Sequence, residues 1–369
     1  MKGFSDPDES LLAVIISHPH QDHYGLSKFL RDDLPIVIGE AAHNILNASI
    51  PFTPSGISFK KTIYMKDRES FNIGPFEIRP YLVDHSAYDA YALFISAGGK
   101  KLFYSGDFRA HGRKAKLFEK LLSNPPNGID VLLMEGTTIG RTQAEEEFQT
   151  EDDLTSDFVN TIQATKGLCM IWSSGQNIDR LVTAYKACRK TRRQLIIDMY
   201  TAEILQAIGN DKLPQENWDG MRVFLPESQK KRIIKGSLFD IPNKYKSHRI
   251  YPESLSKEAK SSVMLIRPSM CEDLEKAKCL AGSRLIHSLW DGYLKMDQQK
   301  PLLHWLDQHK IPLTKIHTSG HASLADLKRF SEAINARKLV PIHSFNTDRF
   351  PEFFNKVENK EDGVWWEIE

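Results

Sequence analysis

The stretch His18-Pro19-His20-Gln21-Asp22-His23 decides the fold, because it places three imidazoles and a carboxylate within six residues. It follows residues 11–17, an apolar run that is typical of a buried strand. Imidazole and carboxylate are ordinary zinc ligands, and a catalytic zinc site keeps one coordination position open for water. Adjacent and alternate side chains of one loop diverge, so the pattern favours two metal ions over one. The alternative is a loop of solvated histidines, but histidine is scarce and this density is hard to obtain otherwise.

The first hundred residues are predicted to be mostly β. Ala97-Gly98-Gly99-Lys100 predicts a hairpin turn between two apolar runs. We expect strands at 36–38, 62–65, 70–83 and 90–105, with helices at 25–34 and 41–48.

Beyond residue 114 the pattern changes to alternating helices and strands, which indicates βαβ units and a parallel sheet. An acidic stretch at 145–153 is a candidate domain boundary. Expected strands lie at 129–134, 168–172, 194–198, 262–266, 284–289, 315–317 and 339–342. Expected helices lie at 115–122, 154–165, 178–189, 201–209, 272–278, 301–308 and 323–335.

The composition excludes little. The 369 residues carry 49 basic and 48 acidic side chains, so the net charge of +1 gives no global argument for nucleic acid or membranes. Four cysteines without disulfide-like density predict reduced thiols in an intracellular protein. The N-terminus has no signal-like apolar region, and no apolar stretch approaches the roughly 20 residues that span a bilayer. A cytoplasmic protein that does not associate with membranes is the default expectation.

The His-x-His-x-Asp-His motif resembles the signature of the metallo-β-lactamase superfamily. Three later segments match its further ligands: Asp84-His85-Ser86, Ser105-Gly106-Asp107 and Pro341-Ile342-His343-Ser344. The resemblance implies that one metal is held by His18, His20 and His85, that the other is held by Asp22, His23 and His343, and that Asp107 bridges them.

A second set of motifs resembles the β-CASP nucleases, the branch that includes ribonuclease J and mRNA 3′-end processing endonucleases. Its members are Leu132-Leu-Met-Glu135-Gly-Thr-Thr, Ile316-His317-Thr-Ser-Gly320-His321-Ala and Pro341-Ile-His343-Ser. Ser173-Ser-Gly175-Gln-Asn-Ile-Asp-Arg180 and Ser288-Leu-Trp290-Asp-Gly-Tyr293 also resemble segments of the domain that is inserted in this branch. The implied fold is α/β, an αββα sandwich with an inserted Rossmann-like β-CASP domain. The expected domains are 1–150, the first part of the lactamase-like domain; 151–296, the insertion; and 297–369, the C-terminal part of the lactamase-like domain.

The resemblance implies a dinuclear metal-dependent ribonuclease in which a bridging hydroxide attacks the phosphodiester. Asp22 would help to hold one of the activating ions, and His321 would stabilise phosphate charge or protonate the leaving oxygen. Glu135 would orient a metal-binding histidine, or simply cap a loop. Weaker candidates for phosphate contacts are Ser173, Ser174, Ser319 and Gly320. The expected cofactors are two divalent ions, zinc with manganese as the alternative.

Basic residues outside these motifs have two interpretations. Arg109, His111 and Arg113 follow the predicted bridging aspartate and could contact a substrate backbone, although a solvated turn is the favoured interpretation for each of them. The basic runs at 189–193 and 230–235 are more typical of exposed helix faces than of a nucleic-acid track.

Only seventeen residues precede His18, whereas the family usually enters the fold through two or more strands. We therefore expect an exposed sheet edge, explained by a misassigned start, a fragment, or a partner or second copy that covers the edge. Two rival functions stay open: a small-molecule metallo-hydrolase acting on a lactam, thioester or lactone, and an inactive subunit for nucleic-acid processing. RNA is the expected substrate and DNA the alternative; the motifs do not separate internal cleavage from cleavage at an end.

Overall fold

The computed structural model describes residues 8–141 and 147–368. It divides into two compact units: the first comprises Met1–His43, Ile57–Phe148 and Ser319–Glu369, and the second comprises Asn44–Gly56 and Gln149–Thr318. The chain returns to the first unit at Ser319 rather than at the expected 297, because residues 313–315 add a strand to the sheet of the second unit. Two residues of the acidic stretch, Glu145 and Glu146, lie outside the described residues.

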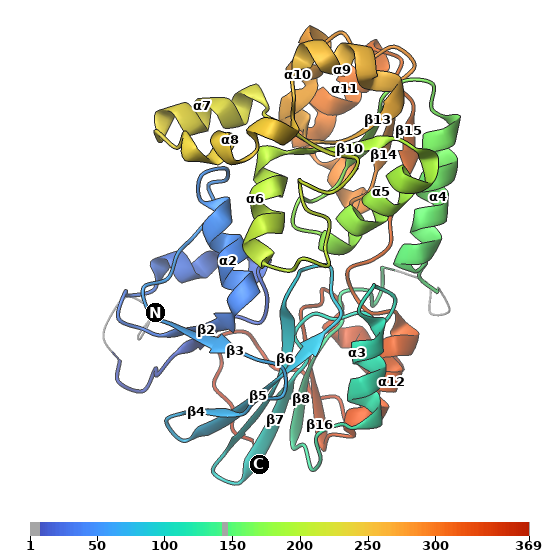
Figure 1. Cartoon of the computed structure of the whole chain (residues 1–369). Helices are drawn as coiled ribbons and strands as arrows, with labels where there is room; N and C mark the ends of the chain where they lie inside the picture. The colour runs from blue at the N-terminus through green and yellow to red at the C-terminus, as the bar shows by residue number, and fades with distance from the viewer. Residues whose placement is uncertain (1–7, 142–146, 369) are drawn as a thin grey trace. The chain divides into compact units, whose positions relative to one another are not determined.

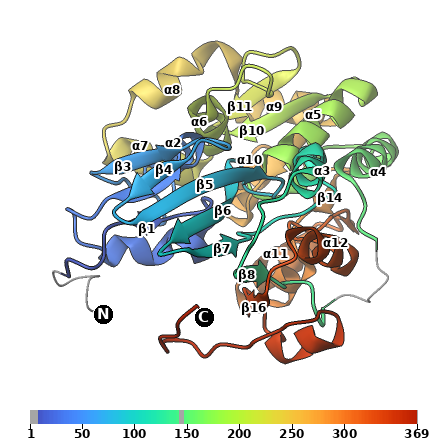
Figure 2. The same cartoon turned by 90° about the horizontal axis from the view of Figure 1, so that it is seen from below.

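The first unit contains two sheets, and the predicted mixed α/β architecture is confirmed. The smaller sheet is parallel, with the order β1-β2-β3: β1 (Val14–Ile15), β2 (Ile36–Gly39) and β3 (Thr62–Met65). The larger has the order β16-β8-β7-β6-β5-β4: β4 (Phe71–Ile73), β5 (Phe76–Val83), β6 (Ala90–Ala97), β7 (Lys100–Tyr104), β8 (Val131–Glu135) and β16 (Lys338–Ile342). Figure 2 shows β5, β6 and β7 side by side. Gly98 and Gly99 make the predicted hairpin turn with φ of 57° and 77°.

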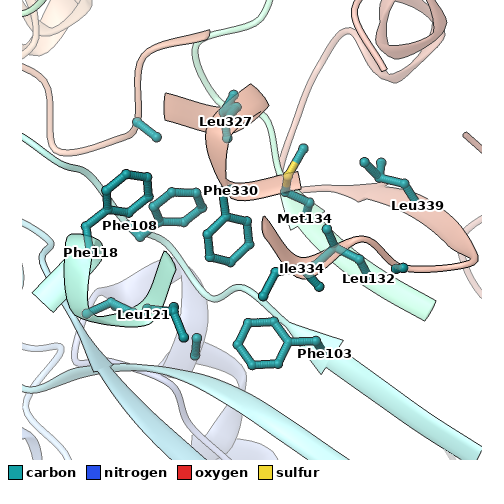
Figure 3. Close-up of a cluster of buried hydrophobic side chains, with 14 of the residues drawn as sticks. Phe103, Phe108, Phe118, Leu121, Leu132, Met134, Leu327, Phe330, Ile334 and Leu339 are labelled. Carbon is teal, nitrogen blue, oxygen red and sulfur yellow. The ribbon is translucent and has the colours of Figure 1, made fainter. Parts of the chain in front are cut away.

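Two helices cover one face of the larger sheet: α3 (Ala115–Ser123) and α12 (Leu324–Ile334) (Figure 1). Their apolar side chains meet those of β7 and β8 in a core that includes Phe103, Phe108, Phe118 and Phe330 (Figure 3). The rings of Phe108 and Phe330 lie 4.4 Å apart. A second cluster, which includes Val37, Ile78 and Tyr91, joins the smaller sheet to the larger. Burial of these large side chains fixes the strands whose ends carry the polar motifs.

The segment after β1 differs from the expected helix at 25–34. The structure has a short α1 (Gln21–Tyr24) followed by a 3₁₀ helix, η1 (Gly25–Phe29). Leu30 is extended, and Pro35 stands close behind, which disfavours a continued helix. β1 lies at one edge of its sheet in the described part of the chain, and Leu12, Leu26 and Phe29 nearby are exposed.

The second unit is built on a seven-stranded parallel sheet of order β12-β11-β10-β13-β9-β14-β15. Its strands are β9 (Cys169–Trp172), β10 (Gln194–Asp198), β11 (Met221–Phe224), β12 (Arg249–Ile250), β13 (Ser262–Ile266), β14 (Arg284–His287) and β15 (Leu313–Lys315). Its α-helices are α4 (Glu151–Ala164), α5 (Ile178–Thr191), α6 (Met199–Ile208), α7 (Glu227–Lys235), α8 (Asp240–Lys244), α9 (Pro252–Glu258), α10 (Cys271–Lys276) and α11 (Lys300–Gln308). Helix α2 (Glu40–Ser49) begins in the first unit, and its second half groups with the second.

Helix α4 begins within the acidic stretch, close to the boundary between the two units. The Thr150 hydroxyl accepts from the amide of Asp153, and the Asp153 carboxylate accepts from the amide of Thr150. This capping box starts the helix within the acidic residues rather than at 154. None of the described helices is both long and apolar enough to cross a membrane.

Candidate metal centre

His18 is the most buried member of the polar cluster, with none of its surface exposed. It follows β1, and its Nδ1 lies 3.1 Å from the hydroxyl of Ser17. Its Nε2 has no hydrogen-bond partner among the described atoms and lies 3.6 Å from Asp107 Oδ2. A buried nitrogen without a partner is costly unless a ligand satisfies it.

His20 and His85 bring two further imidazoles to the same place. His85 Nδ1 donates to the carbonyl of Gly320 at 2.6 Å, which leaves its Nε2 as the lone-pair nitrogen, 3.1 Å from His20 Nδ1. Burial lowers the pKa of His18 and His85 well below the usual value, and lowers that of His20 to about 4. All three rings are therefore neutral near pH 7, the form that binds a metal.

Asp107 stands at the centre of the cluster because of the turn that precedes it. Gly106 has φ of 56°, and a Cβ at that position would lie 2.5 Å from the carbonyl oxygen of Tyr91. Asp107 Oδ2 lies 3.1 Å from His23 Nε2 and 3.7 Å from His343 Nε2. Burial opposes the charge on Asp107, but the hydrogen bond from His23 and the other imidazoles outweigh it, so the pKa of this carboxyl falls below its usual value.

His343 follows β16 and belongs to the second group of potential ligands, with Asp22 and His23. Its φ of 48° lies in the left-handed region, which turns the side chain back toward the loop after β1. Its Nε2 lies 3.2 Å from Asp22 Oδ2 and its Nδ1 lies 2.7 Å from Thr137 Oγ1. The hydrogen bond to Asp22 raises the pKa of His343 to about 9 in the absence of a cation. A cation binding there competes with that proton.

The structure therefore brings all seven predicted ligands together. Potential ligand atoms lie within 4.8 Å of one another in four groups. Two of these groups are the sets that the resemblance implies: His18, His20 and His85; and Asp22, His23 and His343. Asp107 belongs to the other two, once with His18 and His23 and once with Glu135, His321 and His343.

Glu135 contacts a different histidine from the one expected. Its Oε2 lies 3.0 Å from Nδ1 of His321, which is not among the seven predicted ligands. Its Oε1 accepts from the amide of Phe108 at 2.8 Å, and only 1% of the residue is exposed. Burial disfavours the charged imidazole of His321, yet Glu135 outweighs it and raises the pKa of His321 above its usual value.

Arg109 and His111 are buried, so neither the favoured interpretation, a solvated turn, nor a contact with a substrate backbone fits them. Both donate to the carbonyl oxygen of Ser319, Arg109 Nη1 at 3.2 Å and His111 Nε2 at 2.9 Å. Arg109 also pairs with the buried carboxylate of Asp84 at 3.4 Å. Together they tie the loop that carries His85 to the loop that carries His321.

The four predicted phosphate contacts are divided between the two units. Ser319 and Gly320 lie in the first, where their carbonyls hold Arg109, His111 and His85. Ser173 and Ser174 lie in the second, just before α5. The Ser173 hydroxyl is buried and has no hydrogen-bond partner among the described atoms, whereas the Ser174 hydroxyl accepts from the amide of Gln176 at 3.2 Å.

The sequence did not indicate three supporting contacts of the centre: Thr137 with His343, Ser17 with His18, and the Arg109–His111 pair with the carbonyl of Ser319. All four residues lie within or beside the motifs. The contact of Thr137 could not be predicted, because its partner is 206 residues away.

Comparison with known proteins agrees with this arrangement. Residues 4–169 match the family model described as a beta-lactamase superfamily domain. The chain is 21% identical to ribonuclease J of Sinorhizobium meliloti over 349 residues, which is 90% of this chain and 58% of that protein. It is also 21% identical to ribonuclease J of Mycoplasma pneumoniae, covering 90% of this chain and 57% of that protein.

The chain thus spans a little over half the length of these two relatives. Among solved structures, a protein of unknown function from Enterococcus faecalis V583 has the same fold. The TM-score is 0.76 at 22% identity, covering 96% of this chain and 80% of that one. The chain therefore carries a beta-lactamase superfamily domain at residues 4–169, is similar to ribonucleases J over most of its length, and shares its fold with a solved structure.

Proposed function

We propose that the chain is a dinuclear metal-dependent phosphodiesterase that cleaves RNA, with DNA as the alternative substrate. The observation that carries the proposal is the pair of ligand groups that meet at Asp107, where the buried His18 Nε2 has no hydrogen-bond partner among the described atoms. Buried lone pairs that face one another are unfavourable without a cation between them. The residues present therefore fit two metal ions.

His18, His20 and His85 would hold one ion, and Asp22, His23 and His343 the other, with Asp107 reaching both. The imidazole-rich set favours zinc, although the same ligands accept manganese. Two ions bound here supply water activation near neutral pH and neutralise charge on a phosphoryl oxygen.

His321 is the side chain best placed to act on a phosphate beside the metal ligands. Because Nδ1 is held by Glu135, the opposite nitrogen, Nε2, is left for a substrate. The side chain is 21% exposed, in contrast to the buried His18. It would stabilise phosphate charge or donate a proton to the leaving oxygen, and Glu135 would fix its ring and tautomer.

The choice of RNA rests on the relatives, which are named as ribonucleases. Backbone amides at Ser319 and Gly320, and the hydroxyls of Ser173 and Ser174, are proposed to bind flanking phosphates. The unpartnered Ser173 hydroxyl supports this for the second unit.

The test combines metal analysis with hydrolysis of a short 5′-labelled RNA by wild type, Asp107→Ala and His321→Ala. We expect two metals per wild-type chain, loss of both metal and cleavage in Asp107→Ala, and loss of cleavage with metal retained in His321→Ala. The exposed Asp211→Ala is the control that keeps both. Metal loss in His321→Ala contradicts its assignment, and a two-metal wild type that cleaves no phosphodiester contradicts the nuclease proposal.

A further inference from the structure

An exposed apolar face lies on the second unit, directly after β14. Its members are Trp290, Tyr293 and Met296, which are 50%, 42% and 39% exposed. They are spaced by three residues: Tyr293 lies in a 3₁₀ segment, η5 (Asp291–Lys295), and Trp290 and Met296 flank it. The rings of Trp290 and Tyr293 contact each other, so these two side chains form one continuous aromatic surface.

The backbone and a glycine hold the two rings in place. The amide of Tyr293 donates to the carbonyl of Trp290 at 3.0 Å, and that of Met296 to Tyr293 at 3.1 Å. A Cβ at Gly292 would overlap the six-membered ring of Trp290, so the indole lies across the glycine backbone. The rings of Trp290 and Tyr293 meet edge to face, with centroids 5.9 Å apart. The aromatic pair is thus ordered although it is exposed.

This face lies at the edge of the sheet where ligands usually bind. It begins three residues after the carboxyl end of β14, and Ser288 between them is held by the carbonyl of Trp172 and by the buried Arg180. In open parallel sheets, ligands bind beyond the carboxyl ends of the strands where successive connections diverge. Here the connections of the neighbouring strands β9 and β13 run in opposite directions, to β10 and to β14, and β14, which precedes the face, pairs with β9.

Among the charged residues beside the face, the described carboxylates pair with other lysines and leave Lys295 without an ion pair. Asp291 pairs with Lys315 at 2.6 Å, and Asp297 pairs with Lys300 at 2.7 Å. Lys295 is exposed and makes no ion pair with any of the described residues. Fixed aromatic rings beside an uncompensated lysine suit an aromatic ligand that carries a phosphate.

We propose that Trp290 and Tyr293 form a stacking platform for an unpaired base of single-stranded nucleic acid, with Lys295 beside its backbone. The inference rests on the proposed function, because it assigns a subsite for the same class of substrate. Stacking does not depend on which base is present, so the platform favours single strands over duplexes without reading sequence.

The first experiment measures binding of a short fluorescent RNA strand in the Asp107→Ala background, which prevents cleavage. Trp290→Ala should weaken binding on the order of tenfold, while Trp290→Phe keeps most of it. A strand of the same length with abasic sites should bind equally well with and without Trp290. Tyr251→Ala, an equally exposed aromatic of the same unit at 44%, is the matched control and should change nothing.

The second experiment separates this inference from the proposed function. Hydrolysis of bis(4-nitrophenyl) phosphate, which offers no RNA strand, should be the same in Trp290→Ala and wild type, while KM for RNA rises in the variant. If wild type cleaves RNA and Trp290→Ala has the same KM, the platform is overturned and the nuclease proposal stands. If Trp290 determines RNA binding but no phosphodiester is hydrolysed, the platform stands and the nuclease proposal fails.

Two further outcomes overturn the platform. Equal losses with the normal and the abasic strand in Trp290→Ala would show that the base is not what the ring contacts. Loss of self-association in Trp290→Ala, with unchanged RNA binding, would assign the face to a second copy of the chain.

Discussion

The histidine cluster of the first unit and the ion pairs of the second treat buried polar groups in opposite ways. In the first, imidazole nitrogens face one another, as His20 and His85 do at 3.1 Å, and His18 Nε2 has no partner among the described atoms. In the second, the buried cation Arg180 meets the buried anion Glu151 at 3.2 Å, and Arg267 meets Asp198. The first arrangement needs an added cation to be stable, whereas the second balances its own charges. The stability of one unit should therefore depend on metal, and that of the other on internal ion pairs.

The largest expected effect tests the second unit. Arg180→Met leaves Glu151 buried without its cation, so we expect the free energy of unfolding to fall by about 3–5 kcal/mol. Urea denaturation measures it. Lys186→Met, which breaks an exposed pair with Asp152, should cost no more than about 1 kcal/mol. Equal losses in the two variants would contradict the view that burial makes the Arg180 pair matter.

The second largest effect is a loss of activity in the first unit when the backbone before Asp107 is displaced. Gly106→Ala forces a Cβ against the carbonyl oxygen of Tyr91 and displaces Asp107, so we expect a loss of hydrolysis on the order of 100-fold. Gly98→Ala is the matched control, since Gly98 has nearly the same φ, 57°, but nothing within 4 Å of its Cβ position. Activity assays with metal analysis compare them. A similar loss in Gly98→Ala would show that φ strain, and not the position of Asp107, decides the outcome.

Removal of metal should destabilise the first unit and leave the stability of the second unchanged. With free metal at 100 times its dissociation constant, binding stabilises the folded state by about 2.7 kcal/mol. After chelation we expect faster amide exchange in α1 and in the loops around Asp107 and Gly320, with β9 and β13 unchanged. Hydrogen–deuterium exchange measures this. Uniform loss of protection in both units would refute a metal dependence confined to the first.

The smallest effect is a pH dependence of the second unit. Burial opposes the charge on Asp198, but Arg267 outweighs it and lowers the pKa of this carboxyl below its ordinary 3.8. The unfolded chain then binds more protons, so the stabilisation is complete above pH 3.8 and is lost as the pH falls below it. The difference in unfolding free energy between wild type and Asp198→Asn should be constant near neutral pH and shrink below about pH 4. A difference that persists unchanged at low pH would show that Arg267 does not act through this charge.

The sequence predicted the elements that carry the centre because their signals are local. Apolar runs end at polar motifs, and the structure places His18, His85, Asp107 and His343 just beyond the ends of β1, β5, β7 and β16. Elements between Met221 and Glu258 were not predicted, since the helices there are rich in charge and β11 includes the exposed Arg222.

Contacts between residues far apart in the chain could not be predicted from the sequence. The partner of Glu135 is His321, 186 residues away, and no spacing rule distinguishes it from a metal-binding histidine. Burial of Arg109 and His111 likewise follows from the approach of a distant loop, so their positions next to Asp107 suggested a solvated turn or substrate contacts instead. Residue types and strand ends predicted where the centre lies, but not which side chains hold it in shape.

The interruption of the first unit by the second has a consequence for synthesis on the ribosome. His321, His343 and strand β16, which pairs with β8, are all translated after the second unit. A nascent chain can begin to fold from its N-terminus, but it cannot close the centre until residue 343 has left the exit tunnel. A message broken before codon 343 would therefore yield products that lack this histidine, so the complete set of ligands is reserved for chains translated as far as residue 343.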